Sequence, residues 1–148
     1  MPNIDVIKQL REATGISVVE CQKALKDSGG DIEKAKEILK KWGKEFARSR
    51  TERETKQGIV DSYIHLGKKV GVMIELRCET DFVAKSDDFK NLSHELCLQI
   101  AAISSDEVPL FSQPWIKDQG KTIKDLIEAH IAKLGENIVL EKFIRYAL

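Results

Sequence analysis

The chain has 148 residues, 42% hydrophobic and 32% charged, a composition expected for one compact domain or two small ones. Its 24 Lys and Arg residues are balanced by 24 Asp and Glu residues, whereas a protein that coats phosphates normally has a basic excess, so no direct nucleic-acid partner is expected. The apolar stretches are too short to cross a bilayer and the first residues do not resemble a secretory signal, so we expect a cytoplasmic protein without a membrane partner.

Two short helices are predicted at the start of the chain. Asn3 can cap the first, which carries an apolar stripe and ends at Gly15, the residue type favoured just past a helix end. Ser17 and Glu20 have the S-x-x-E spacing of a capping box, which opens a second helix that continues to Leu25.

A third helix follows the break at residues 29–30. Asp31 can cap it, and apolar residues recur at helical spacing as far as Trp42. Three helices of this length enclose only a small core. We therefore expect residues 1–43 to form a marginal domain that is stabilised by the surface on which it docks.

The pattern then changes twice. Residues 44–57 are rich in charges of both signs, which predicts an exposed helical linker. Within residues 58–148, the stretch 70–78 alternates between apolar and other residues, as in a strand with one buried face. Residues 59–66 are predicted to pair with it as a hairpin that turns at residues 67–69.

The rest of the chain predicts two helices and a last strand. Ser86 can cap a helix with an acidic first turn. Its core-facing residues are predicted to be Phe89, Leu92, Leu96, Ile100 and Ile103. A second helix covers about residues 122–134 and ends at Gly135. A final strand is indicated by Ile138, Leu140, Ile144 and Tyr146, with Lys142 interrupting the alternation. The sum is an α+β fold with a small, mostly antiparallel sheet packed by helices.

Nothing in the chain resembles a catalytic or cofactor-binding motif. Cys21, Cys78 and Cys97 are widely separated and the three histidines are scattered, so neither a structural zinc site nor any other metal site or cofactor is expected. Each cysteine lies in an apolar pattern and is interpreted as a small packed residue. A thiol enzyme that uses Cys78 or Cys97 is an alternative, but a reactive cysteine needs an accessible, electropositive setting.

The segment Thr80, Asp81, Phe82 and Val83 joins the clearest strand to the helix after Ser86. Side chains at such junctions project from a rigid base, and Thr80 or Asp81 can cap a short turn. Phe82 is either a core residue or an exposed apolar wedge. Spacing alone favours the core, because buried aromatic residues are commoner than exposed functional ones.

Several motifs resemble those of the elongation factor Ts family. Residues 78–89 resemble its signature C-E-T-D-F-V-A-R-N-D-E-F, and residues 10–15 with 21–25 resemble its N-terminal motif. Residues 30–35 continue that motif, and Ile64–His65 and residues 135–138 also match. Each motif alone is weak, but together they cover nearly the whole chain in the expected order.

The resemblance implies a fold and a function. It implies an N-terminal three-helix ubiquitin-associated-like domain, followed by the sheet-containing core, and elongation factor Tu as the partner in its GDP-bound and nucleotide-free forms. The implied activity is guanine nucleotide exchange without bond-making chemistry. The N-terminal helices would dock on the GTPase domain, through Arg11, Thr14, Gly15, Val18 and Val19. Asp81 and Phe82 would intrude beside the bound magnesium ion, with Thr80 and Val83 completing the partner-binding segment, which favours the exposed position for Phe82.

Some features depart from the family pattern. Val18 and Val19 stand where two methionines are frequent, and only a few residues separate Val108 from Pro114, where many relatives carry a long helical insertion. Short members with one core copy often pair, which makes a homodimer a reasonable expectation. A binding module for ubiquitin-like or nascent-chain partners is the other alternative, but it leaves residues 78–83 unexplained.

Overall fold

The computed structural model describes residues 3–148, and within that range it has the α+β fold that the sequence predicted, with the five predicted α-helices and a sixth of a single turn. The helices are α1 (Ile4–Thr14), α2 (Val18–Asp27), α3 (Ile32–Arg50), α4 (Asp81–Ala84), α5 (Asp87–Ala102) and α6 (Ile123–Leu134), with a short 3-10 helix η1 (Leu110–Ser112). The strands are β1 (Gln57–Ile64), β2 (Val70–Cys78), β3 (Pro114–Trp115), β4 (Asp118–Thr122) and β5 (Ile138–Ala147). They form an antiparallel sheet in the order β1-β2-β5 and a small β3-β4 pair.

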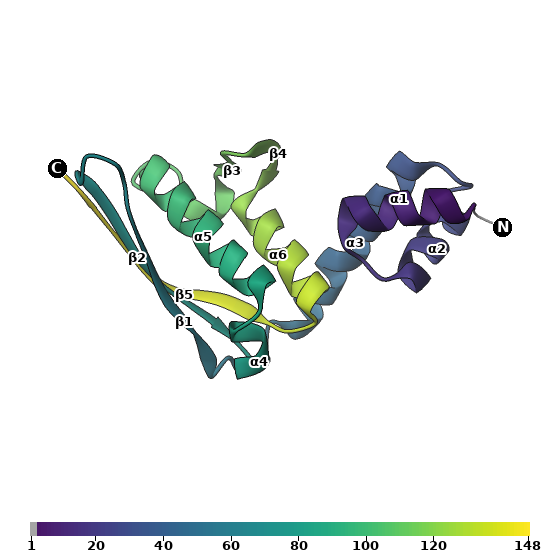
Figure 1. Cartoon of the computed structure of the whole chain (residues 1–148), viewed down its shortest axis with the longest axis horizontal. Helices are drawn as coiled ribbons and strands as arrows, with labels where there is room; N and C mark the ends of the chain where they lie inside the picture. The colour runs from purple at the N-terminus through teal and green to yellow at the C-terminus, as the bar shows by residue number, and fades with distance from the viewer. Residues whose placement is uncertain (1–2) are drawn as a thin grey trace.

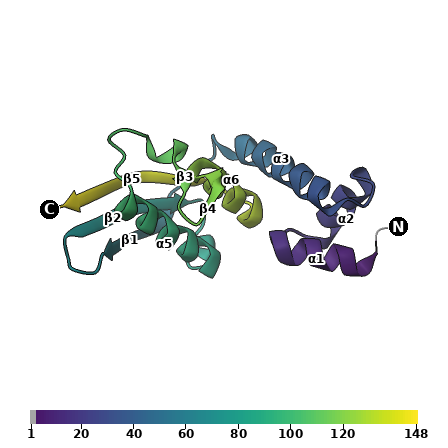
Figure 2. The same ribbon diagram turned by 90° about the horizontal axis from the view of Figure 1, so that it is seen from above.

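The molecule is elongated, with α1 and α2 at one end and the three-stranded sheet at the other (Figure 1). Helix α3 runs between the two parts and packs against α6. Each part has its own apolar cluster. The smaller cluster comprises Ile7, Leu10, Cys21, Ala24, Leu25, Ala35 and Leu39. Seen from above, α1, α2 and the first half of α3 stand clear of the sheet (Figure 2).

The predicted caps of the first three helices are confirmed. The Asn3 side chain accepts from the Asp5 N–H, the Asp31 side chain accepts from the Lys34 N–H, and Gly15 has the left-handed φ of 70° that favours glycine. The Ser17 hydroxyl accepts from the Glu20 N–H at 3.3 Å, as in a capping box. In a capping box the Glu20 carboxylate would accept from the Ser17 backbone N–H, but here it accepts from the Ser17 hydroxyl.

Helix α3 is longer than the apolar pattern indicated. It continues without a break to Arg50, so the first half of the charged segment 44–57 is helical, and Ala47 from that segment is buried in the larger cluster. A Cβ added at Gly43 would lie 3.3 Å from the Cβ of Ala132, which shows how closely α3 approaches α6. The proposed division into residues 1–43, 44–57 and 58–148 stays a prediction, and one helix crosses its first boundary.

The register of β5 corrects the alternation that the sequence analysis assigned to it. Leu76 pairs with Leu140, but Glu75 pairs with Lys142, so Glu141 is an extra residue in a β-bulge. Beyond the bulge the two faces exchange. Ile144 and Tyr146, which were assigned to the same face as Ile138 and Leu140, are 45% and 71% exposed on the outer face.

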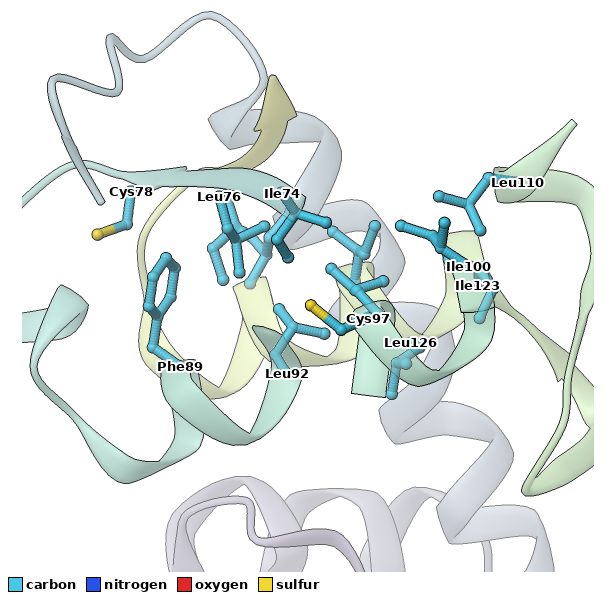
Figure 3. Close-up of a cluster of buried hydrophobic side chains, with 14 of the residues drawn as sticks. Ile74, Leu76, Cys78, Phe89, Leu92, Cys97, Ile100, Leu110, Ile123 and Leu126 are labelled. Atoms are coloured by element: carbon cyan, nitrogen blue, oxygen red, sulfur yellow. The ribbon is translucent and has the colours of Figure 1, made fainter. Parts of the chain in front are cut away.

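The larger cluster lies between the inner face of the sheet and the helices α5 and α6. Figure 3 shows residues of β2, α5 and α6 packed together, among them Leu76, Phe89, Leu92 and Leu126. The predicted core face of α5 is confirmed with one correction. Ile103 is 37% exposed because the helix has already ended at Ala102 and the backbone there is extended.

Candidate functional site

Phe82 lies on the surface. Its side chain is 87% exposed on α4, a single helical turn that directly follows β2. Thr80 caps this turn, since its hydroxyl accepts a hydrogen bond from the Val83 N–H at 3.3 Å. The interpretation of Phe82 as a core residue, which spacing alone favoured, is therefore wrong. A large exposed aromatic side chain on a capped turn is suited to insertion into a partner.

The other members of the segment point in different directions. Val83 is only 5% exposed and packs in the larger cluster, so it holds the turn onto the core and does not join Phe82 at the surface. Asp81 is exposed and its carboxylate forms an ion pair with Lys85 at 2.7 Å, which raises the pKa of Lys85. The part of the segment that a partner can reach therefore consists of Thr80, Asp81 and Phe82.

A hydrogen-bond network fixes the base of the turn. The Glu136 carboxylate, from the connection between α6 and β5, accepts from the N–H groups of Glu79 and Thr80 at 3.1 and 2.9 Å. It also accepts from the Thr80 hydroxyl at 2.7 Å. The Glu79 carboxylate in turn accepts from the Asn137 N–H at 2.7 Å and pairs with Arg53. The sequence analysis included this position only within the motif at residues 135–138 and gave it no role.

The second predicted surface lies on α1 and α2. Val19 is 74% exposed and Val18 is 41% exposed in the first turn of α2, whereas Leu25 on the same helix is fully buried. The two valines are therefore outside the small core. A shallow hollow beside Val19 is lined by Gln22, Lys23, Leu25, Lys26, Gly29 and Gly30.

The remaining docking candidates lie at the C-terminal end of α1 and just after it. Arg11 and Gly15 are exposed at the end of α1, and the Arg11 carbonyl accepts the Gly15 N–H at 2.7 Å, which closes the helix. Thr14 is half-buried and its hydroxyl donates to the Leu10 carbonyl at 2.8 Å and accepts from the Ile16 N–H. Thr14 thus shapes the loop before α2.

The two surfaces do not meet in one pocket. In Figure 1, α4 lies at the edge of the core, whereas α2 lies beside the first half of α3, at the opposite end of the molecule. A partner that contacts both must therefore extend along the molecule. Each surface offers an apolar group, Phe82 in one case and Val19 in the other, beside charged side chains.

The cysteines do not have the properties of nucleophiles. All three are buried. Burial raises the pKa of Cys97 to about 12, and burial together with the charge of Glu136 raises the pKa of Cys78 to about 11. Both are therefore protonated thiols near neutral pH. Within residues 3–148, no group of three or more His, Cys, Asp or Glu side chains is arranged to hold a metal ion. Across the same range, no helix is long and apolar enough to span a membrane.

Comparison with known proteins agrees with the motifs. A family model described as "Elongation factor TS" matches residues 79–148, which include Phe82 and Glu136. Elongation factor Ts of Coprothermobacter proteolyticus is 39% identical over 189 positions, which cover 97% of this chain and 96% of the relative. Elongation factor Ts of Thermotoga neapolitana is 38% identical over 97% of this chain and 95% of the relative. Both alignments are longer than this chain, so the relatives contain inserted residues that it lacks. The chain belongs to the elongation factor Ts family.

Proposed function

We propose that this protein is a guanine nucleotide exchange factor that binds elongation factor Tu and promotes the release of GDP, so that GTP can bind. The observation that carries the proposal is the exposed ring of Phe82 on a turn whose first residues are held by hydrogen bonds to the Glu136 carboxylate. Membership of the elongation factor Ts family supports the same partner.

Docking is assigned to the N-terminal helices. We infer that residues 1–43, of which the structure describes 3–43, form a ubiquitin-associated-like domain that contacts the GTPase domain of elongation factor Tu. Val18 and Val19 would be covered by the partner, and Arg11 would lie at the rim of the contact. The exposure of the two valines supports this role, since burying them on binding is favourable and leaves the small core intact.

Exchange is assigned to Phe82 and Asp81. Magnesium bridges the nucleotide phosphates to a GTPase and neutralises their charge, so a group that disturbs the ion's supports weakens nucleotide binding. The Phe82 ring would displace the protein segment or water that holds the ion, and the Asp81 carboxylate would perturb its hydration. Thr80 and Val83 would hold these two side chains in place through the cap and the core contact.

In this proposal, the free energy of binding to elongation factor Tu drives the release of GDP. If the exchange factor binds the nucleotide-free partner more tightly than the GDP form, linkage requires that it lower the affinity for GDP by the same factor. No covalent bond is made or broken, so the proposal needs no catalytic acid, base or nucleophile. A partner that works in translation would place this protein in the cytoplasm.

We also propose that the protein forms a homodimer through the outer face of the three-stranded sheet. Helices cover only the inner face of this sheet. The outer face carries exposed apolar side chains on all three strands, namely Val60, Ile64, Met73, Ile144 and Tyr146. The same face of a second copy has the same apolar character, so pairing the two would remove both from water.

The test of the exchange proposal is the release of fluorescent GDP from elongation factor Tu. Substoichiometric amounts of the protein should accelerate release, and the protein alone should not hydrolyse GTP. A release rate that stays at its intrinsic value with saturating protein and a matched partner would refute the proposal.

A further inference from the structure

Glu136 and Glu79 each accept backbone N–H groups from the other's connection, at the junction that carries Phe82. The Glu136 carboxylate accepts three hydrogen bonds from residues 79 and 80, which lie 57 and 56 positions away in the chain. The Glu79 carboxylate accepts from the N–H of Asn137, the residue after Glu136. The two connections, one after β2 and one before β5, are thus joined by a reciprocal pair of carboxylate–amide contacts.

These contacts take the place of the β-ladder hydrogen bonds beyond the end of the sheet. The last paired residues of the two strands are Cys78 and Ile138, so the N–H groups of Glu79 and Thr80 have left the β-ladder. A carboxylate that accepts two backbone N–H groups satisfies donors that would otherwise depend on water, and charge-assisted bonds of this kind are among the stronger ones. The direction of the backbone entering α4 is therefore set by the Glu136 side chain.

Thr80 connects the Glu136 carboxylate to the helical turn that carries Phe82. Its hydroxyl donates to Glu136 at 2.7 Å and accepts from the Val83 N–H at 3.3 Å, so one oxygen atom links the carboxylate to the first turn of α4. The Phe82 ring itself makes little contact with the protein, since 87% of it is exposed. Its position therefore depends on the backbone beneath it.

The same carboxylate relates this turn to the docking helices. Glu136 follows Gly135, the left-handed residue that ends α6, and α6 packs against α3. Helix α3 also contributes side chains to the smaller cluster, which packs against α2, and Val19 lies on the exposed side of α2. A continuous series of helix contacts thus connects the docking surface to the base of α4.

We propose that Glu136 is a positioning residue for nucleotide exchange, which fixes the direction in which Phe82 is presented to the partner. This inference rests on the proposed exchange function. Glu136 does not touch the nucleotide in this account, and it acts through Thr80. Its loss should therefore slow exchange at saturation more than it weakens docking.

The test compares three substitutions in the full chain. Glu136→Ala removes all three acceptor contacts, and Glu136→Asp keeps the charge but shortens the side chain by one methylene. Glu136→Gln keeps one acceptor oxygen for the backbone N–H groups and an amide that can donate to Thr80. Glu107→Ala is the matched control, because Glu107 is an exposed glutamate on a distant loop without a hydrogen bond or ion pair among residues 3–148.

Two quantities are measured from GDP release against protein concentration, namely the maximal rate and the concentration that gives half of it. For Glu136→Ala we expect the maximal rate to fall by about tenfold or more, since small misplacements of acting groups have effects of this size, with the half-saturating concentration within about threefold of the wild type. Glu136→Gln should retain at least about half of the rate. Amide hydrogen exchange at Glu79 and Thr80 should be faster in Glu136→Ala, and Glu107→Ala should match the wild type in both assays.

Three results would overturn the positioning role. They are an unchanged maximal rate in folded Glu136→Ala, a maximal rate and half-saturating concentration that worsen in proportion, and a Gln variant as slow as the Ala variant. If Glu136→Ala does not fold, Glu136→Asp is judged by the same criteria. Failure of the exchange proposal is distinguishable, because the wild-type protein would then not accelerate GDP release at all.

Discussion

At the scale of single residues, Phe82 and Phe89 show how position decides the role of one side-chain type. Phe82 is 87% exposed on α4 and Phe89 is fully buried in α5, although only seven positions separate them. Both follow a hydroxyl cap, Thr80 in one case and Ser86 in the other. Phe82 lies two positions after its cap and Phe89 three, and in both helices the core covers the third position, where Val83 and Phe89 are buried.

The first prediction concerns Phe82→Ala. Because the ring is exposed, the free energy of unfolding should change by less than about 1 kcal/mol. The maximal GDP-release rate should fall by about tenfold or more, since aromatic anchors often contribute about 2 kcal/mol at interfaces. Asp81→Ala should give a smaller version of the same result.

Thermal melts and GDP-release rates, measured on the same preparations, check this prediction. Phe89→Ala is the control for a core aromatic residue, and it should cost about 3 to 5 kcal/mol of stability. A large loss of melting temperature for Phe82→Ala, with normal exchange by the fraction that remains folded, would contradict the role of the ring in exchange.

The second prediction concerns Val19→Asp. Val19 is 74% exposed, so the melting temperature should change little. A carboxylate at a docking contact would be buried without a partner, which should weaken the complex with elongation factor Tu by about 2 kcal/mol or more. Val108→Asp makes the same chemical change on an exposed loop residue and should leave the affinity unchanged. Calorimetric titration with elongation factor Tu measures the affinities of the two variants, and a thermal melt measures the stability of Val19→Asp. Unfolding of Val19→Asp would show that Val19 supports the core.

At the scale of secondary-structure elements, the bulge in β5 determines on which face of the sheet the last apolar residues of this strand lie. The extra residue Glu141 turns Ile144 and Tyr146 outward, beside Met73 of β2. Without the bulge these side chains would face the helices. The outer face that we propose as the homodimer contact therefore depends on one inserted residue.

The third prediction is that the protein dimerises through this face. Sedimentation velocity over a concentration series should show a dimer, and Tyr146→Asp should shift it to the monomer by placing a charge in the contact. Ile4→Asp, on an exposed residue of α1, should leave the dimer intact. A wild-type protein that remains monomeric throughout the series would contradict the proposal.

The contact between α3 and α6 has an electrostatic component that depends on pH. Lys44 of α3 forms ion pairs with Asp125 and Glu128 of α6, and Lys40 lies 3.8 Å from Asp125. Burial by itself raises the pKa of Asp125, but hydrogen bonds from Lys44 and from the Thr122 N–H, with the nearby lysine charges, outweigh it and lower the pKa to about 2.

The fourth prediction follows from this shift. The folded pKa of Asp125 lies below its ordinary value of 3.8, so its contribution to stability is present above that value and is lost as the pH falls towards 2. Between about pH 5 and pH 2, the wild type should lose about 2 kcal/mol more unfolding free energy than Asp125→Asn. Denaturant unfolding measures this difference. Asp106→Asn, at an exposed residue, should keep the wild-type pH dependence, and identical profiles for wild type and Asp125→Asn would contradict the assignment.

At the scale of the whole molecule, α3 connects two apolar clusters that do not merge. Its first half packs with α1 and α2, and Ala47 in its second half is buried with the sheet and α6. The two proposed contact surfaces are therefore held at a fixed separation by one continuous helix. A partner that engages both gains the second contact at high effective concentration.

The fifth prediction tests this arrangement with Glu45→Pro. Proline inside a helix removes a hydrogen bond and kinks the axis, at a cost of about 3 kcal/mol. Glu45 is exposed between the two clusters, so the kink should misalign the docking surface and Phe82, and the maximal GDP-release rate should fall. Glu45→Ala is the control for loss of the carboxylate. Wild-type exchange by folded Glu45→Pro would show that the rigid connection is not required.

Local sequence patterns were sufficient to predict the individual helices and strands. The caps at Asn3, Ser17, Asp31 and Ser86 and the alternation in β2 depend on neighbours within a few positions, so pattern was sufficient to predict them. The α+β class followed from the order of these elements. The family was also identifiable from short motifs in order along the chain.

Features that depend on contacts between distant parts of the chain became visible only in the folded molecule. The bulge at Glu141 appears only when β5 is paired with β2, and the exposure of Phe82 follows from which side of α4 the core covers. Glu136 gains its partners from residues more than fifty positions away. Such contacts depend on how the chain returns to itself, and this is set by the packing of the whole molecule, which no local pattern contains.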